Sequence, residues 1–332
     1  MTEHHDQARD AGGRDPLAEL LQRAGARPGI DPAARQRVEQ AAREAWMRQL
    51  RRHRQRRWVL SLAAAGAFAT VLAGWLWRLQ PAPAAPLALR IERIDGRVAR
   101  VVDGQRLPLQ ADRPLHRGDR LQLGADATLS LRDAAGGELR VGPGSEVSLR
   151  DERSVELHGG RLYVDNHGAA GSWTLSTPLL TARDIGTRFL VQHLQGLSTV
   201  AVRDGEVEIA AASGEQERIG AGRRLQLAAD GEFKVSADPG HGADWDWVVD
   251  AAVPPALQAR PVREFLRWYA GEAGLRLVVD EDAELARRLD APLEGSVEGL
   301  GVREWLELAA VAAQFELSTR GDLGALHVRA AR

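Results

Sequence analysis

The sequence predicts a membrane protein with one transmembrane helix, a short N-terminal helical segment, an all-β domain and a small C-terminal α+β module. Three observations predict this class: an uncharged apolar run at 58–77, period-two alternation across 90–238, and a repeated helix–strand pattern after 240. We therefore expect five parts, namely a helical segment at 1–57, a membrane helix at 58–77, a Pro/Ala-rich linker at 78–89, a β-sandwich or roll at 90–238, and an α+β repeat module at 240–332.

The N-terminal segment contains two helix start signals. Asp15-Pro16 and Asp31-Pro32 each combine an N-cap residue with a proline at the first helical position. Apolar side chains follow each signal at helical spacing, and the candidates for contact with a cytoplasmic partner are Leu17, Leu20, Leu21, Val38 and Trp46. The segment is either a solvated stalk or an amphipathic surface that such a partner covers.

The run from Trp58 to Trp77 contains 20 residues and no charged side chain. At about 1.5 Å per residue it spans about 30 Å, the thickness of the hydrocarbon core of a bilayer. Six arginines lie between positions 48 and 57, whereas Arg78 alone follows before Arg90. This asymmetry predicts a cytoplasmic N-terminus and C-terminal domains on the other side of the membrane.

Two other interpretations of this run remain open. A signal peptide could be cleaved near Ala82-Pro83-Ala84, although its apolar core should be shorter and closer to the N-terminus. A buried soluble helix would rarely be apolar all round over this length. Small residues recur every fourth position at Ala65, Ala69 and Ala73, a spacing that allows two helices to pair, so a homo-oligomer is a further alternative.

Charge divides unevenly between the two sides of this run. Residues 1–57 carry 13 Arg against 8 Asp or Glu, whereas residues 78–332 carry 31 basic and 38 acidic residues. The basic excess lies next to the predicted lipid bilayer rather than on a folded surface suited to nucleic acid, so we expect no direct nucleic-acid partner. The chain has no cysteine, and the outer part must therefore fold without disulfides or thiolate metal sites.

The middle region alternates apolar and polar residues. Pairs such as Leu129/Leu131, Leu139/Val141 and Val155/Leu157 recur every 8–10 residues, which predicts a meander of antiparallel strands buried on one face. Asp-Gly pairs stand at 95–96, 103–104, 204–205 and 230–231, and each predicts a tight hairpin because both residues tolerate positive φ. The pair in "STVAVRDGEVEIA" is the cleanest example.

The C-terminal region contains an internal repeat. "PVREFLRWYAGEAGLRLVV" at 261–279 aligns with "GVREWLELAAVAAQFELST" at 301–319, and each copy predicts a helix followed by a strand. "LGALHVRA" predicts a last strand, "APLEGSV" another, and Asp280, Glu281 and Asp282 a solvated loop. The expected core of the module comprises Val262, Phe265, Leu266, Val302, Trp305 and Leu306.

The sequence contains no assembled catalytic motif. The nine histidines are scattered, no metal-ligand spacing such as H-E-x-x-H occurs, and no nucleophile elbow or phosphate loop is present. "DWDW" at 244–247 offers two carboxylates without acid–base partners, so we interpret it as aromatic packing between domains. We expect no enzyme activity, no catalytic residue, no cofactor and no metal.

Several segments, taken in order, resemble the periplasmic domain of FecR-type regulators. "GRVARVVDGQRLPLQADRPLHRGDRLQLGADATLSLRD", "STPLLTARDIGTRFLV" and "VAVRDGEVEI" carry the resemblance across about 90–235. The positions most typical of the family are Thr177, Pro178, Gly186, Thr187, Phe189, Asp204 and Gly205. We expect these residues to be structural, with Gly186 at a bulge or close backbone approach and Phe189 in the core.

The C-terminal module is similar to the short N-terminal domains of secretins and TonB-dependent receptors, with Gly274, Leu293 and Gly295 at the matching positions. The resemblance implies an inner-membrane anti-sigma-type regulator. Residues 1–57 would hold an extracytoplasmic-function sigma factor, and 240–332 would meet the periplasmic signalling domain of a TonB-dependent outer-membrane receptor. Two alternatives stay open: the module only packs on the β-domain, or the β-domain holds an envelope glycan or protein without a sigma partner.

Overall fold

A computed structural model describes residues 85–255, 260–292, 300–320 and 324–331, and residues 20, 33, 35–44, 46, 47 and 75 nearer the N-terminus. The chain divides into two compact units, Met1–Ala82 and Pro83–Arg332. The two units are described separately.

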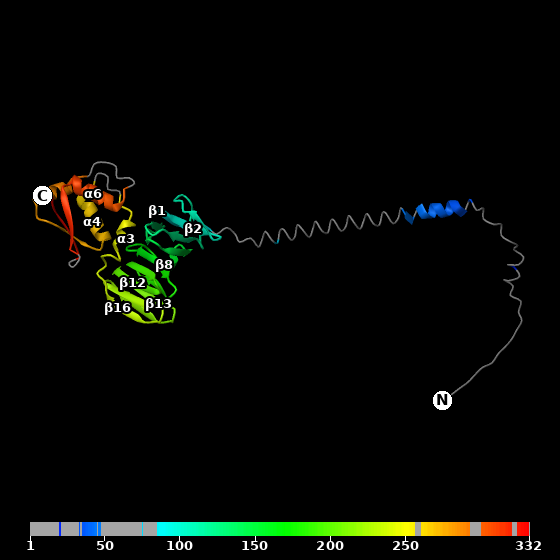
Figure 1. The fold of residues 1–332 in the computed structure, drawn as a ribbon, viewed down its shortest axis with the longest axis horizontal. Coiled ribbons are helices and arrows are strands. Elements are labelled where there is room, and N and C mark those ends of the chain that lie inside the picture. The colour runs from blue at the N-terminus through cyan, green and yellow to red at the C-terminus, as the bar shows by residue number, and fades with distance from the viewer. Residues whose placement is uncertain are drawn as a thin grey trace, which may run out of the picture. The chain divides into compact units, whose positions relative to one another are not determined.

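The described residues of the first unit are helical, as the segment 35–44 illustrates (Figure 1). Leu20, Val38 and Trp46 are exposed, whereas Leu17 and Leu21 lie outside the described residues. The predicted membrane helix at 58–77 also lies outside them, apart from the helical and exposed Trp75. Within the part of the chain that is described, no helix combines the length and apolar character needed to cross a bilayer.

In residues 85–255, sixteen strands form one continuous sheet that bends into two halves, here called sheet I and sheet II. Sheet I has the order β1–β5–β6–β8–β11–β12–β15–β16. Its strands are β1 (Leu89–Asp95), β5 (Thr128–Asp133), β6 (Glu138–Val141), β8 (Ser154–Asp165), β11 (Arg188–Leu194), β12 (Leu197–Asp204), β15 (Arg223–Ala228) and β16 (Phe233–Ala237).

Sheet II has the order β3–β2–β4–β7–β8–β9–β10–β13–β14. Its other strands are β2 (Val98–Val102), β3 (Gln105–Pro108), β4 (Arg120–Leu123), β7 (Glu146–Asp151), β9 (Thr174–Ser176), β10 (Leu180–Asp184), β13 (Glu206–Ala211) and β14 (Gln216–Gly220). All pairs in the two sheets are antiparallel except β8 with β9.

The long strand β8 belongs to both sheets. Its first half pairs with β7 and β9, and its second half pairs with β6 and β11. The change occurs at Gly160, which has φ +100° and lies so close to Ser145 that a Cβ would approach the Ser145 hydroxyl to 2.3 Å. Glycine is therefore required where the strand bends from one sheet into the other.

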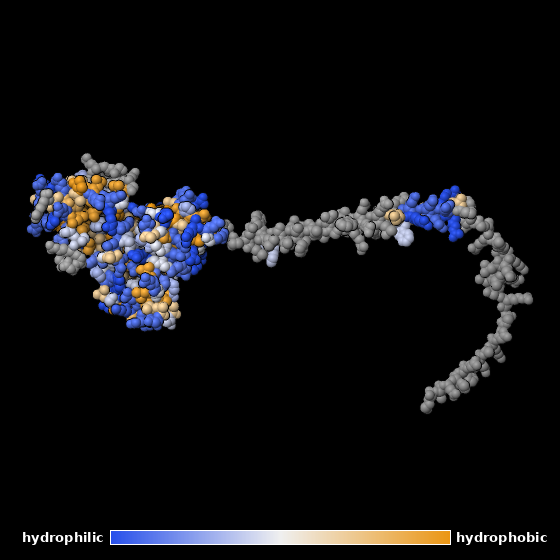
Figure 2. All heavy atoms as spheres, in the orientation of Figure 1, coloured by the Kyte–Doolittle hydropathy of each residue, from blue (hydrophilic) through white to orange (hydrophobic). Residues whose placement is uncertain are grey.

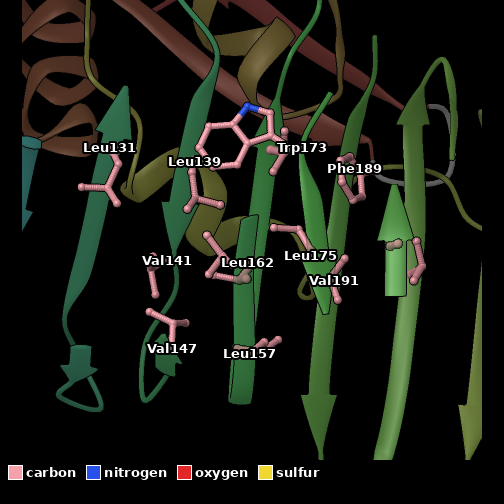
Figure 3. Packing of buried hydrophobic residues seen from close by; sticks show 14 of the residues in the cluster. Leu131, Leu139, Val141, Val147, Leu157, Leu162, Trp173, Leu175, Phe189 and Val191 are labelled. Atoms are coloured by element: carbon pink, nitrogen blue, oxygen red, sulfur yellow. The ribbon is translucent and has the colours of Figure 1, made fainter. Parts of the chain in front are cut away.

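One apolar core fills the space between the two sheets. Leu131, Leu139 and Val191 come from sheet I, and Val147 and Leu175 come from sheet II. Figure 3 shows these side chains in one cluster with the fully buried Trp173, which precedes β9. The predicted all-β sandwich or roll is thus confirmed.

The four Asp-Gly pairs have two different outcomes. Asp103-Gly104 joins β2 to β3, and residues 229–232 join β15 to β16, so two hairpin predictions are confirmed. The predictions at 95–96 and 204–205 are wrong, because β1 and β12 belong to sheet I while β2 and β13 belong to sheet II. At these two positions the turn carries the chain from one sheet to the other.

The central strands of sheet I are covered on both faces, contrary to the expected burial on one face. All four residues of β6 are buried, and five consecutive residues of β12 are buried. The short helix α3 (Asp246–Asp250) packs with Trp245 against Tyr163, Leu190 and Ala201 on the outer face. "DWDW" therefore provides aromatic packing, as predicted, from a turn and a helix.

The C-terminal module contains the predicted repeat. Helix α4 (Val262–Glu272) precedes strand β17 (Arg276–Val279), and α6 (Val302–Ala312) precedes β18 (Phe315–Arg320). The last strand, β19 (Ala325–Ala330), lies between them, parallel to β17 and antiparallel to β18. Phe265 of α4 and Trp305 of α6 stack in the core with ring centroids 4.1 Å apart. The predicted small α+β module is confirmed.

Helix α5 (Ala283–Asp290) was not expected from the sequence. Asp282, predicted to lie in a solvated loop, is its N-cap and accepts hydrogen bonds from the N–H groups of Glu284 and Leu285, both at 2.8 Å. Leu285 and Leu289 are fully buried in the module core. The predicted strand in "APLEGSV" lies mainly outside the described residues, as do Leu293 and Gly295.

Candidate functional site

The residues typical of the family lie at the turns before and after strand β10, at the turn after β12, and, for Phe189, on strand β11. Thr177 closes the β9–β10 turn, because its hydroxyl accepts hydrogen bonds from the N–H groups of Leu179 and Leu180 at 3.2 and 3.1 Å. The same hydroxyl lies 2.8 Å from the hydroxyl of Ser198 on β12. Pro178 is exposed at the tip of this turn. Thr177 thus links a turn of sheet II to a strand of sheet I.

Gly186 and Thr187 form the turn between β10 and β11. Gly186 has φ +69°, which favours glycine, but a Cβ there would meet nothing within 4 Å. The expected close approach is made instead by Gly205, at φ +82°, where a Cβ would lie 2.5 Å from Cγ2 of the buried Thr187. Phe189 is fully buried, next to a bulge between β11 and β12. The two turns therefore support each other.

A buried polar cluster holds the Gly186 turn. Asp184 is fully buried, and its carboxylate accepts hydrogen bonds from the N–H of Gly186 at 3.0 Å, from Nδ2 of Asn166 at 2.8 Å and from the N–H of Trp173. The N–H of Asn166 donates to the carbonyl of Thr187 at 2.9 Å. The sequence analysis missed Asp184 and Asn166. An Asp two residues before a turn Gly was the available signal.

Asp204, the partner of Gly205 in the third turn, lies at the surface. Its carboxylate is 3.0 Å from Nδ1 of His167, and both side chains are about half exposed. The hydroxyl of Thr187 is buried without a hydrogen-bond partner. The family-typical residues consequently build turns and core: Thr187 and Phe189 are buried, Pro178, Gly186 and Gly205 are exposed at turns, and Asp204 is partly exposed.

A second cluster of charged groups joins the β-domain to the C-terminal module. Arg140 of β6 is 2% exposed, and its guanidinium contacts Glu138 at 2.6 Å, Glu272 of α4 at 2.6 Å and the carbonyl of Val248 in α3 at 2.8 Å. Burial alone would lower the pKa of Arg140, but Glu272 and Glu138 outweigh it and raise that pKa. Arg140 is therefore a permanently charged residue that links β6 to α3 and α4.

Arg203 of β12 strengthens the same interface. Its guanidinium donates to the carbonyls of Gly240 at 2.8 Å and Glu272 at 2.7 Å, and stacks 4.3 Å from the ring centroid of Trp245. Burial lowers the pKa of Arg203, and burial raises the pKa of Tyr163, which lies beneath both guanidinium groups. Gly274 permits this fit, because a Cβ there would lie 2.3 Å from the Gly240 carbonyl.

The predicted core residues of the module are inward-facing. Val262, Phe265, Leu266, Val302 and Trp305 are buried, and Leu306 is half-buried against them. The exposed side of α6 carries two further apolar residues, Leu308 and Val311, which are 46% and 77% exposed. Figure 2 shows an apolar area over the helices of this module. These exposed residues were not among the predicted partner contacts.

Two hollows lie on the described surface. One, of about 430 Å³, is lined by Ala310, Val311, Gln314, Phe315 and Ala331 beside the exposed side of α6. The other, of about 450 Å³, is a polar trough on the outer face of sheet II, lined by residues including Thr181, Arg183, Glu208 and Arg218. Within the described part of the chain, no group of three or more His, Asp or Glu side chains is placed to hold a metal ion.

The fold and these clusters define a bent β-sandwich with an α+β module fixed to its outer face. Residues 119–208 match the family model described as FecR protein. The chain therefore carries a FecR family domain within its β-domain, as the resemblance predicted.

Solved structures give a more distant likeness. Two crystal structures of a candidate anti-sigma factor from Parabacteroides distasonis each share 13% sequence identity with this chain at a TM-score of 0.34. The match covers 64% of this chain and 99% of that protein. No curated protein matches the chain.

Proposed function

We propose that the chain is a single-pass inner-membrane regulator of the anti-sigma type. It relays a signal from the periplasmic signalling domain of a TonB-dependent outer-membrane receptor to a cytoplasmic extracytoplasmic-function sigma factor. The observation that carries this proposal is the FecR domain at 119–208, which follows an apolar run long enough to span a bilayer. In the proposed topology, residues 1–57 lie in the cytoplasm and Pro83–Arg332 lies in the periplasm.

The C-terminal module is the proposed receptor-binding end. Among the described strands, β17 and β18 each pair with β19 alone, so the outer edge of each is open to strand addition. The hollow beside Val311 and Phe315 adjoins the start of β18 and offers an apolar recess for a partner side chain. Arg140 and Glu272 support transmission of the signal, because they fasten this module to the FecR domain.

The segment 1–57 is the part of the chain that we propose contacts the sigma factor. Val38 and Trp46 are 69% exposed on a described helix, and burying such side chains against a partner is favourable by about 1.5–3 kcal/mol each. Tryptophan is among the residues that most often anchor a protein–protein interface, so Trp46 is the expected anchor of this contact.

A bacterial two-hybrid assay with the full-length chain against each sigma factor of the organism tests this proposal. We expect one extracytoplasmic-function sigma factor to interact, Trp46→Ala to abolish the interaction, and Gln40→Ala on the opposite side of the same helix to preserve it. Should no sigma factor interact at normal protein levels, the chain would instead be a membrane-anchored envelope-binding protein.

A further inference from the structure

Strand β1 is the first strand of the unit Pro83–Arg332, the outer unit of the proposed topology, and it directly follows the segment that leads from the predicted membrane helix. Among the described strands it pairs with β5 alone, so it forms one edge of sheet I. An edge strand with a neighbour on one side is held by fewer backbone hydrogen bonds than a central strand, and it opens more readily.

A β-bulge in β1 turns one side chain to the outer face of the sheet. Ile91 pairs with Leu131 and Arg93 pairs with Ser130, so Glu92 is an extra residue. Because of this insertion, Ile91 and Ile94 both pack against the core although they are three positions apart. A regular strand would have sent Arg93 inward.

Both members of the Arg93–Ser130 pair contact the C-terminal module. Nη1 of Arg93 donates a long hydrogen bond of 3.5 Å to the carbonyl of Leu300, which precedes the N-cap of α6. The hydroxyl of Ser130 is 1% exposed and donates to the carbonyl of Ala251 at the C-cap of α3. The module is therefore seated over the bulge that joins β1 to β5.

We infer that β1 is the strand through which a change in the C-terminal module reaches the chain that leads toward the membrane. In the resting state the module holds β1 at the edge of sheet I. With the module seated, Arg93 and Ser130 supply the support that a second neighbouring strand would give. A ligand that moves α3 or the start of α6 removes this support, and β1 then opens together with the chain that leads toward the membrane. The inference goes beyond the proposed function, since it depends on neither the receptor nor the sigma factor.

Hydrogen exchange of the full-length protein in detergent, followed by mass spectrometry, tests this coupling. Arg93→Ala and Ser130→Ala should each raise the exchange rate of peptides covering Leu89–Asp95 about tenfold, since each removes a hydrogen bond to the module. Peptides from the central strands β11 and β12 should keep their wild-type rates. Arg90→Ala, a change of an exposed arginine on the same strand, should leave β1 unchanged.

Two results would overturn the inference. Unchanged exchange of β1 in both variants would mean that pairing with β5, together with the hydrogen bond from the N–H of Leu87 to the carbonyl of Leu115, holds the strand without the module. A uniform rise across all peptides of the β-domain, in the Ser130→Ala variant as in Arg93→Ala, would mean that these residues support the whole domain rather than β1. Because the readout is amide exchange, its failure would leave the proposed sigma-factor interaction untouched.

Discussion

Arg140 illustrates how a single residue fixes the relation between two parts of the outer unit. Its guanidinium is 2% exposed, and the partner carboxylate of Glu272 is 13% exposed. Removing one member of a buried ion pair leaves the other charge without compensation, which costs about 3–5 kcal/mol. The pair therefore acts as a constraint on domain position, because without α4 the buried Arg140 keeps Glu138 but loses Glu272.

We predict that Glu272→Ala lowers the free energy of unfolding of the outer unit by about 3 kcal/mol, since the buried Arg140 loses this carboxylate, whereas Arg203 keeps its hydrogen bond to the backbone carbonyl of residue 272. Urea unfolding followed by tryptophan fluorescence measures the effect, and Trp245 lies in the affected interface. Glu307→Ala, at an exposed position of α6, is the matched control. Equal midpoints for the two variants would contradict the constraint.

Gly104 and Gly205 allow the energetic cost of a strained backbone to be measured apart from the cost of a close contact. Gly104 and Gly205 both have positive φ, +78° and +82°, but a Cβ at Gly104 meets nothing whereas one at Gly205 lies 2.5 Å from Thr187 Cγ2. Alanine at Gly104 should cost about 1–2 kcal/mol from the left-handed backbone alone. Alanine at Gly205 should cost at least about 1 kcal/mol more, because the Thr187 turn must move. Thermal unfolding of both variants measures the difference.

At the scale of elements, identical turn chemistry gave two different topologies. Gly104 and Gly205 both have positive φ, but Asp103 has positive φ as well and Asp204 does not; the first pair closes a hairpin and the second passes the chain to another sheet. The dipeptide alone therefore determines neither the turn geometry nor the strand pairing, which depends on which sheet buries the next apolar residues. The positions of the strands and turns were predictable, whereas the assignment of strands to sheets was not.

Helix α5 was missed for a related reason. It is eight residues long, and its apolar face consists mainly of Leu285 and Leu289, so its periodic signal is weak. Its start signal was nevertheless present, because Asp282 is an N-cap residue placed two positions before Glu284. Longer and more apolar helices, such as α4 and α6, were predictable from the repeat.

The repeat makes a prediction at the level of these two helices. Phe265 and Trp305 are buried partners from α4 and α6, so Phe265→Ala should lower the free energy of unfolding of the module by about 3–5 kcal/mol. Leu308→Ala on the exposed side of α6 should change it by less than about 0.5 kcal/mol. A melting temperature of Phe265→Ala equal to that of Leu308→Ala would show that the pair is not a core contact.

At the scale of the whole molecule, the contacts least accessible to sequence analysis were those between the β-domain and the module. Arg140 and Glu272 are 132 positions apart, and neither belongs to a motif. Alternation indicated that one face of sheet I is buried, but the cover on the other face is provided by α3, a helix of five residues that includes Trp247 and has Trp245 as its N-cap. Such contacts arise from the final arrangement of the chain rather than from any local pattern.

The proposed topology can be tested because the chain has no cysteine. In cells with a permeabilised outer membrane, a membrane-impermeant maleimide should label a single cysteine introduced by Arg90→Cys and should leave one introduced by Gln40→Cys unlabelled. If the apolar run between these positions spans the bilayer, the membrane keeps the reagent away from position 40. Labelling of both positions, or of Gln40→Cys alone, would contradict the arrangement, and lysed cells give the control for reactivity.

Deleting 240–332 is a poor test of receptor binding, because it would expose the buried outer face of sheet I, including Tyr163 and Leu190. Substitutions on the free side of α6 avoid this problem. Leu308→Glu combined with Val311→Glu places two charges beside the hollow lined by Val311 and Phe315, and should lower receptor-dependent reporter output about tenfold or more if the partner buries these residues. The unfolding midpoint should stay the same, since both side chains are already exposed.

Val235→Glu on β16 is the matched control, because Val235 is 40% exposed on a different part of the outer unit. It should leave both reporter output and stability unchanged. Full output from the Leu308→Glu, Val311→Glu variant at wild-type protein levels would exclude this face as the docking surface. The open edges of β17 and β18 would then remain as the partner-binding elements, and charged substitutions beside each edge would distinguish them, since strand addition requires a free edge.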